Sequence, residues 1–117
     1  MYGYTKVRDY AFYYCKDLAL TSLPEGLTNI RNYAFYYCTS LALTSLPESL
    51  TNIGNDAFSG CTSLASITFK GTPSSIRSTA FNGCTNLTDI KVPWAEGAVA
   101  NAPWGATNAT ITYNYTE

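Results

Sequence analysis

A cysteine recurs every 23 residues through most of this 117-residue chain, and this fixed period constrains the fold more than any other feature of the sequence. The four positions are Cys15, Cys38, Cys61 and Cys84. An Ala-Phe pair precedes each cysteine and a leucine follows it at constant offsets, so a whole segment recurs rather than one residue. A period in this range is typical of solenoids, in which each repeat forms one coil and stacks on the next. The sequence therefore predicts a stack of about four coils.

The residues around each cysteine predict a short helical segment. Ala57, Phe58, Cys61 and Leu64 follow the spacing i, i+1, i+4 and i+7, which places them on one face of about two helical turns. The residue three positions before each phenylalanine has a side chain that commonly caps a helix N-terminus. We therefore expect a short α or 3-10 helix in each coil, stabilised by packing against its neighbours. The expected caps are Asp9, Asn32, Asn55 and Ser78.

A strand is expected after each helix. The pattern Leu64-x-x-Ile67-x-Phe69 matches the strand signature of leucine-rich repeats. In the second repeat, Thr44 occupies the position of Ile67, so regular alternation would point Thr44 into the core and Leu43 outward. A bulge could restore the pattern, or the leucines could be exposed, and the sequence leaves both alternatives open. The first repeat departs in the same way at Leu20 and Thr21.

The unit from Ile53 to Phe69, which reads IGNDAFSGCTSLASITF, resembles the repeat of the BspA-like leucine-rich-repeat family. The likeness extends from about Val7 to Val92. It implies a right-handed α/β solenoid of about four coils, with a parallel sheet on the concave face and short α or 3-10 helices on the convex face. That family consists largely of bacterial and protist surface or secreted proteins implicated in adhesion. The resemblance thus implies a non-enzymatic binding role and transfers no catalytic residue.

The C-terminal quarter of the chain departs from the repeat. We expect residues 1–92 to form the solenoid and residues 93–117 to form a capping segment with a last strand, in which Ile111 takes the position of Ile90. A short helix is expected in residues 93–102, and the two tryptophans of this segment are expected to cover the core rather than bind a ligand. The segment also resembles the terminal part of similar repeat proteins in gut bacteria and their phages.

The beginning of the chain lies in the middle of a coil. Val7 occupies the position of Ile30, so Met1 falls at the position of Pro24. The sequence therefore predicts that the chain continues a longer array, or that another subunit covers this uncapped N-terminal end by self-association. Residues 1–8 lack the apolar core of a signal peptide, so a cell-surface or secreted location rests on the family resemblance alone.

Composition excludes several classes of function. Charged residues make up 13% of the chain, the net charge is −1, and no run of Lys or Arg occurs, which argues against nucleic-acid binding. No apolar run approaches the roughly 20 residues of a membrane span. Histidine is absent, and so are phosphate-binding loops and nucleophile elbows. We therefore expect neither an enzyme nor a cofactor.

The four cysteines are expected to be buried free thiols. They share one inward column, so their side chains would point in parallel, whereas the two cysteines of a disulfide must converge. A zinc ion needs tetrahedral convergence, which a straight column does not provide. The sequence therefore predicts no disulfide and no metal site.

Six tyrosines of the first two repeats form the first candidate binding surface. Because the Ala-Phe pairs and the cysteines face inward, several of these tyrosines should lie on the outer surface. Tyrosine offers a large contact area at a small cost in conformational entropy. They could recognise a partner, or they could cover thin packing near the uncapped end. They are Tyr10, Tyr13, Tyr14, Tyr33, Tyr36 and Tyr37.

The outer face of the predicted sheet is the second candidate surface. It carries small polar side chains that could bind a glycan or peptide, or could be simply solvated. Its chief members are Ser66, Thr68, Asp89 and Lys91. We thus expect a module for protein or glycan recognition in adhesion, belonging to a larger surface or phage-tail protein. The alternative is a purely structural spacer or assembly module without its own ligand.

Overall fold

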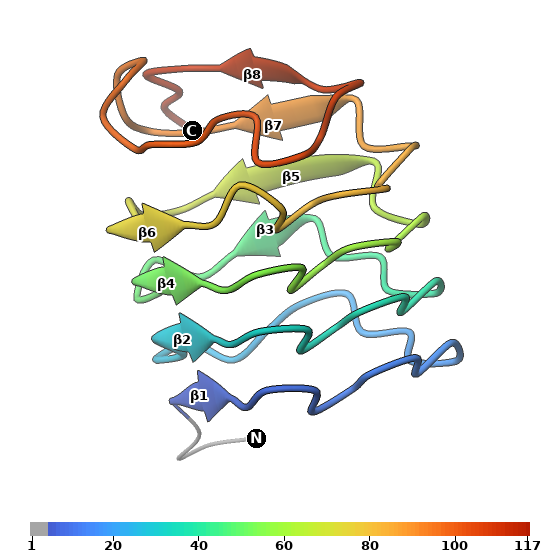
Figure 1. Cartoon of the computed structure of the whole chain (residues 1–117). Coiled ribbons are helices and arrows are strands. Elements are labelled where there is room, and N and C mark those ends of the chain that lie inside the picture. The colour runs from blue at the N-terminus through green and yellow to red at the C-terminus, as the bar shows by residue number, and fades with distance from the viewer. Residues whose placement is uncertain (1–4) are drawn as a thin grey trace.

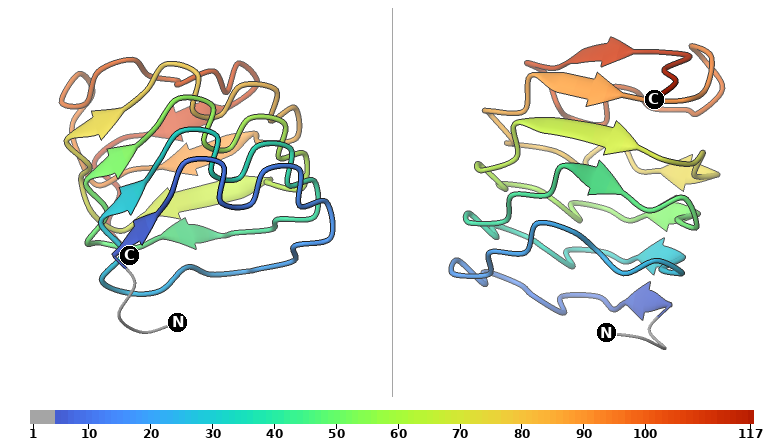
Figure 2. Two further views of the ribbon diagram at one scale, coloured as in Figure 1. Left: turned by 60° about the horizontal axis from the view of Figure 1, so that its bottom comes forward. Right: turned by 180° about the vertical axis from the view of Figure 1, so that it is seen from behind.

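The computed structural model describes residues 5–117 as a solenoid of about five turns (Figure 1). Short strands form two parallel four-stranded sheets, which lie on separate sides of the coil (Figure 2). The first sheet has the order β1 (Lys6–Val7), β2 (Asn29–Ile30), β4 (Asn52–Ile53) and β6 (Ser75–Ile76). The second has the order β3 (Ser45–Leu46), β5 (Ser66–Phe69), β7 (Asp89–Lys91) and β8 (Thr110–Thr112).

Each coil is one sequence repeat. Ile30 pairs with Ile53, and Ile67 pairs with Ile90, so partners lie one period apart on both sheets. The predicted parallel solenoid is therefore confirmed. The sequence predicted only the second sheet, whereas the limb that returns across the coil also pairs and forms the first.

The predicted convex helices are wrong, because residues 5–117 contain neither an α-helix nor a 3-10 helix. Consecutive turns take their place, and the helix expected in residues 93–102 is also a series of turns and bends. The physical reason is a positive φ inside the segment, at Tyr33 (59°) and Asp56 (54°), since a right-handed helix requires negative φ at every residue. The same described residues include no helix long and apolar enough to cross a membrane.

Successive backbone N–H groups of these turns alternate between a hydrogen bond to the next coil and a hydrogen bond within their own turn. The Phe35 N–H donates to the Ala57 carbonyl of the next coil at 2.8 Å, while the following Tyr36 N–H donates within its own turn to Tyr33 at 3.3 Å. Tyr37 again donates to the next coil, to the Ser59 carbonyl at 2.7 Å. A helix would direct these groups along its own axis and leave none to join the coils. Stacking thus selects the turn conformation.

Two of the four predicted N-cap residues, Asp9 and Asn32, accept hydrogen bonds from the next coil instead. The Asn32 side-chain oxygen accepts a hydrogen bond from the Asn55 backbone N–H at 2.8 Å, and Asp9 accepts one from the Asn32 N–H at 3.0 Å. The predicted helix caps are therefore wrong, because these hydrogen bonds cross to the next repeat rather than starting a helix.

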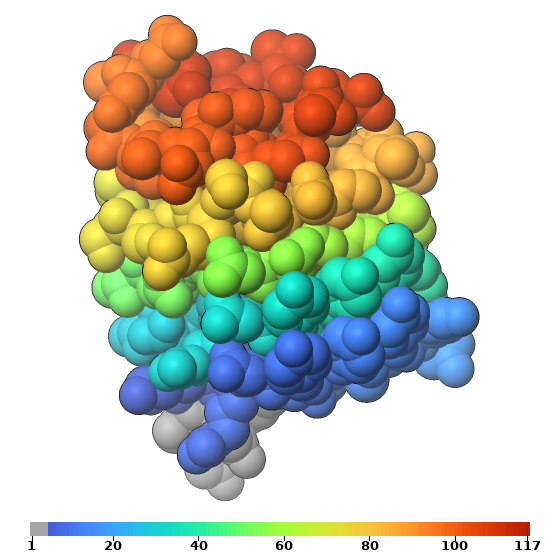
Figure 3. Space-filling model, viewed as in Figure 1, coloured from blue at the N-terminus to red at the C-terminus, as the bar shows by residue number. Residues whose placement is uncertain are grey.

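The core consists of repeated apolar columns that run through the stack of coils. Figure 3 shows the coils from outside as successive layers, from blue at the N-terminus to red at the C-terminus. Phe35, Phe58 and Phe81 are fully buried, and each ring stacks on the next with centroids 5.3 Å apart. Phe12 extends the column into the first coil, where it is only partly buried. Burial of these columns is the main source of stability, because it removes apolar surface from water.

The structure also decides the register of the second repeat. Leu43 is buried and Thr44 is exposed, and β3 begins only at Ser45. A local departure from strand alternation thus turns Leu43 into the core, so the alternative with exposed leucines is wrong for this coil. In the first coil Leu20 is partly buried and Thr21 is exposed.

Aromatic side chains cover the C-terminal end of the core. Trp104 and Trp94 are buried, as expected, and their rings lie 6.1 Å and 5.3 Å from Phe69. The Phe81 N–H donates to the Trp104 carbonyl at 2.8 Å, so this segment continues the ladder between coils. Strand β8 pairs with β7 and places Ile111 beside Ile90, which confirms the expected register of the last strand.

We predict that Phe58→Ala lowers the free energy of unfolding by about 3–5 kcal/mol, because it opens a cavity in the middle of the aromatic column. The measurement is the midpoint of urea denaturation. The matched control is Thr88→Ala, at an exposed position, with an expected change within about 0.5 kcal/mol. Equal losses in the two variants would contradict the central role of the column.

Candidate binding surface

The six predicted tyrosines lie together in the structure, and we call this set the tyrosine cluster. Tyrosines at the same position of consecutive coils stack nearly parallel, because parallel coils repeat at about 4.8 Å. The ring centroids of Tyr10 and Tyr33 are 5.0 Å apart, with an interplanar angle of 2°. The other stacked pairs are Tyr13 with Tyr36 at 5.2 Å and Tyr14 with Tyr37 at 5.4 Å.

Edge-on contacts within each coil complete the tyrosine cluster. Tyr13 meets Tyr14 at 4.7 Å and 86°, and Tyr36 meets Tyr37 at 4.8 Å and 71°. Such stacked and T-shaped arrangements are the ones that aromatic pairs prefer. Four rings are nonetheless substantially exposed. Their exposed fractions are 54% for Tyr10, 44% for Tyr13, 47% for Tyr14 and 40% for Tyr37. The rings are therefore held in place and still accessible.

Glycine ends the tyrosine cluster at the third coil. A Cβ atom on Gly60 would lie 2.7 Å from the Tyr37 ring, so this ring packs flat on the glycine backbone. Gly60 also has a φ of 74°, which glycine adopts without strain. Because Tyr37 has a large side chain and Gly60 in the next coil has none, a shallow hollow of about 210 Å³ forms beside the Tyr37 ring. Its lining is Tyr36, Tyr37, Asp56, Ser59, Gly60, Asn82 and Gly83.

One carboxylate, from Asp56, lies in this hollow. It accepts a hydrogen bond from the Ser59 hydroxyl at 2.7 Å, and that hydroxyl also lies 3.0 Å from the Thr79 carbonyl oxygen. The negative charge of Asp56 raises the pKa of Tyr33, and desolvation raises the pKa of Tyr36. Both phenols therefore stay protonated at neutral pH and can donate hydrogen bonds. The sequence did not predict this hollow; its only signal was the replacement of the Tyr-Tyr pair by Ser59-Gly60.

The second candidate surface is a flat polar strip across β5 and β7. Asp89 lies at its centre, 3.3 Å from the Ser66 hydroxyl and 3.5 Å from the Lys91 ammonium. That ammonium also lies 5.3 Å from the centre of the Tyr115 ring. Thr68 pairs with Lys91 in the sheet. The structure thus brings the four predicted residues together, but the charges of Asp89 and Lys91 already have partners in each other.

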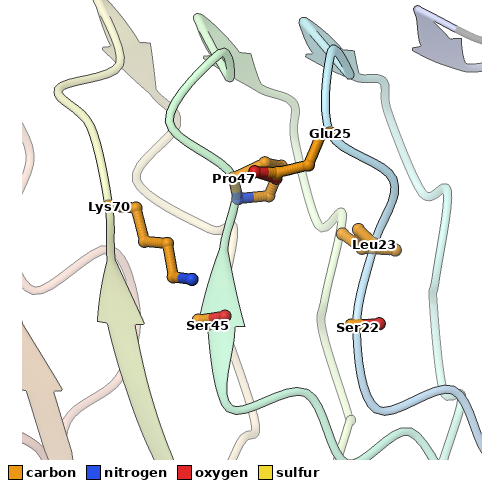
Figure 4. Close-up of a pocket in the computed structure, with 6 residues that line it drawn as sticks. All are labelled: Ser22, Leu23, Glu25, Ser45, Pro47 and Lys70. Carbon is orange, nitrogen blue, oxygen red and sulfur yellow. The ribbon is translucent and has the colours of Figure 1, made fainter.

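A further hollow of about 240 Å³ lies beside β3 (Figure 4). Lys70 and Glu25 approach it from different coils and carry opposite charges. Their side chains do not converge on a common point, so we assign no chemistry to this hollow. Its lining is Ser22, Leu23, Glu25, Ser45, Pro47 and Lys70.

The cysteines form an inward column of free thiols. Cys38, Cys61 and Cys84 are buried, while Cys15 is partly exposed. The Cys61 thiol donates to the Phe35 carbonyl of the preceding coil at 3.1 Å, and the equivalent bonds of Cys38 and Cys84 measure 3.0 Å. Burial raises the pKa of Cys38 to about 11 and that of Cys84 to about 12, and it raises the pKa of Cys61 as well. Nowhere in residues 5–117 do three His, Cys, Asp or Glu side chains gather as metal ligands would.

We predict that iodoacetamide labels Cys15 first in the folded protein near neutral pH. Thiolate is the reactive form, and both burial and the raised pKa suppress it at the other three positions. Mass spectrometry after timed labelling measures the order. In urea, all four thiols should react at similar rates. A disulfide found without reductant, or early labelling of Cys61, would contradict this prediction.

No curated protein sequence matches the chain. Among solved structures, the chain is similar to the crystal structure of a leucine-rich repeat protein from Bacteroides ovatus, with 25% identity and a TM-score of 0.46. The similarity covers 74% of this chain but only 28% of that protein, so the chain spans little more than a quarter of its length.

The family comparison covers most of the sequence. A family model described as "BspA type Leucine rich repeat region (6 copies)" matches residues 5–99. Leucine-rich repeats are typically non-enzymatic and are often used as modules for protein binding. The sequence match and the parallel coils agree with the resemblance seen in the repeat itself, and the chain therefore belongs to the BspA-type leucine-rich repeat family.

Proposed function

We propose that this chain is a non-enzymatic binding module that recognises a protein or a glycan through the tyrosine cluster. Within this proposal the module serves adhesion at a cell surface or in a phage tail, as part of a larger protein whose solenoid is closed by residues 93–117. The single observation that carries the proposal is that four tyrosines are 40–54% exposed while stacking holds the whole cluster in order.

The tyrosine rings are held in fixed orientations by stacking, and this favours binding. Part of the cost of forming a complex is the loss of side-chain freedom, and stacked rings have already lost some of that freedom. Each ring offers a flat apolar face for a sugar ring or an apolar side chain, and each hydroxyl offers a hydrogen bond. The hollow beside Tyr37 adds the Asp56 carboxylate and the Asn82 amide at the edge of the cluster.

A second candidate is an assembly module without its own ligand. One observation favours it: Phe12, Cys15 and Leu18 are only partly buried, whereas their counterparts in the second coil are fully buried. The apolar surface that these three residues leave exposed in the described part of the chain is surface that a second copy could cover.

The first test replaces the four exposed tyrosines together. Tyr10, Tyr14 and Tyr37 have positive φ, so Asn is the suitable replacement because it tolerates this conformation better than other residues; Tyr13 is replaced by Ser. We expect binding to purified extracellular-matrix proteins or to a glycan array to weaken by at least about tenfold, or about 1.4 kcal/mol. The circular dichroism spectrum should stay unchanged.

The control for this test is the double variant Ser66→Ala and Thr68→Ala on the polar strip, which should bind as the unaltered protein does. If the polar-strip variant loses binding and the tyrosine variant keeps it, the tyrosine cluster is not the recognition surface. If the unaltered chain binds neither panel, the assembly module becomes the better explanation.

The assembly candidate has its own measurement. Light scattering over a range of concentrations should show growth beyond the 12.7 kDa of one chain if the first coil self-associates. Leu18→Ser should then shift the mass back toward one chain, because it makes the partly exposed apolar surface polar. A mass that stays constant at all concentrations would contradict self-association.

A further inference from the structure

Basic side chains gather along one edge of the solenoid, where the first sheet ends. Lys6 lies in β1, and Arg8, Arg31 and Arg77 directly follow β1, β2 and β6. We call these four residues the basic edge. These four residues are more than half of the seven lysines and arginines in the chain. Two hollows lie along the basic edge, and Asp9 is the one acidic residue among the eight of the chain that lines either of them. The remaining chain therefore holds three cations and seven acids, so the net charge of −1 conceals a local positive surface.

Stacking produces this edge from residues that are far apart in the sequence. Arg8, Arg31 and Arg77 hold equivalent positions in three coils, and Gly54 holds that position in the coil between the last two. With coils at about 4.8 Å, Arg31 and Arg77 start about 10 Å apart along the stack. A Cβ atom on Gly54 would lie 2.6 Å from the Asn32 side-chain oxygen, so a side chain does not fit there. The result is a notch between two guanidinium groups.

The notch is polar throughout. Its volume is about 220 Å³. The Asn52 amide donates to the Asn29 side-chain oxygen at 2.9 Å, which leaves the Asn29 amide nitrogen and the Asn52 oxygen free to bond to a ligand. An amide nitrogen can donate a hydrogen bond to a sugar hydroxyl group, and an amide oxygen can accept one from it. No apolar side chain lines the notch, whose members are Asn29, Arg31, Asn32, Asn52, Gly54 and Arg77.

The charges of the basic edge are largely uncompensated. Arg31 Nε lies 3.6 Å from Asp9 Oδ1, but both side chains are 48% exposed, and exposed pairs of this kind are weak. Within residues 5–117, neither Arg8 nor Arg77 has an acidic partner within ion-pair distance. Arg31 and Arg77 therefore remain available to an anionic ligand, and the planar guanidinium group suits carboxylate and sulfate oxygens.

We propose that the basic edge binds an acidic glycan. The guanidinium groups of Arg31 and Arg77 contact its carboxylate or sulfate groups, while Asn29 and Asn52 contact its hydroxyl groups. The wholly polar lining favours a sugar over an acidic peptide, which would bring apolar side chains with no surface to cover. Only four cations and no aromatic side chain line the two hollows, so a nucleic acid fits less well. This site is separate from the tyrosine cluster and stands or falls independently of it.

The test measures binding to immobilised heparin, as a sulfated glycan, and to polygalacturonate, as a carboxylated one, with neutral dextran as the blank. We expect binding to at least one of the two acidic glycans, weakening as salt concentration rises because salt screens exposed charges. The variant Arg31→Gln with Arg77→Gln should bind about tenfold more weakly. The matched control, Lys16→Gln with Lys70→Gln, removes the same charge from exposed positions elsewhere and should bind within about twofold of the unaltered chain.

Several results would overturn the proposal. They are an absence of binding to both acidic glycans, equal losses in the arginine and lysine variants, or tighter binding to polyglutamate or to a single-stranded oligonucleotide.

Urea denaturation checks that the arginine variant is folded. If it is not, Arg77→Lys provides the second test, since it keeps the charge but removes the planar group and should still weaken binding. The tyrosine variant should keep its heparin affinity, which separates a failure here from a failure of the proposed function.

Discussion

The hydrogen bonds between coils are the constraint on which the rest of this structure depends. Across residues 5–117, a coil of 23 residues has no helix and only two-to-four-residue strands, so its backbone cannot satisfy its polar groups alone. The Phe35 N–H must reach Ala57, and the Phe58 N–H must reach Ala80, both at 2.8 Å. Buried backbone groups without partners are costly, so each coil requires the next one in the same register. This requirement keeps the repeat length constant.

The same constraint explains the columns of identical side chains. Once the register is fixed, a phenylalanine stacks on a phenylalanine and a cysteine thiol meets the carbonyl of the coil before it. Cysteine fits because it is small, apolar enough to be buried and still able to donate a weak hydrogen bond. Its conspicuous recurrence reflects packing, and the raised pKa of Cys38 and Cys84 is a consequence of that burial.

Between the core positions the coils are free to differ, and the candidate binding surfaces lie there. Tyr36-Tyr37 in the second coil corresponds to Ser59-Gly60 in the third, and Arg31 corresponds to Gly54. Each change to glycine forms a step or notch beside a large side chain, because the neighbouring coil packs onto the glycine backbone. Variation against a constant scaffold thus produces both the tyrosine cluster with its hollow and the notch of the basic edge.

The sequence by itself determined the coil length, the inward columns and the family, because a strict period leaves few other ways to bury the same residues. It also placed the tyrosines in register, since equivalent positions must lie side by side. Only the tertiary structure decided that turns replace helices: the spacing of Ala57, Phe58 and Cys61 suits both, and the choice depends on where the N–H groups find partners. The same period aligned Arg8, Arg31 and Arg77 in one column. The tertiary structure decided that the limb returning across the coil forms a second sheet and that a polar notch opens at Gly54, because the packing between coils is invisible in a single repeat.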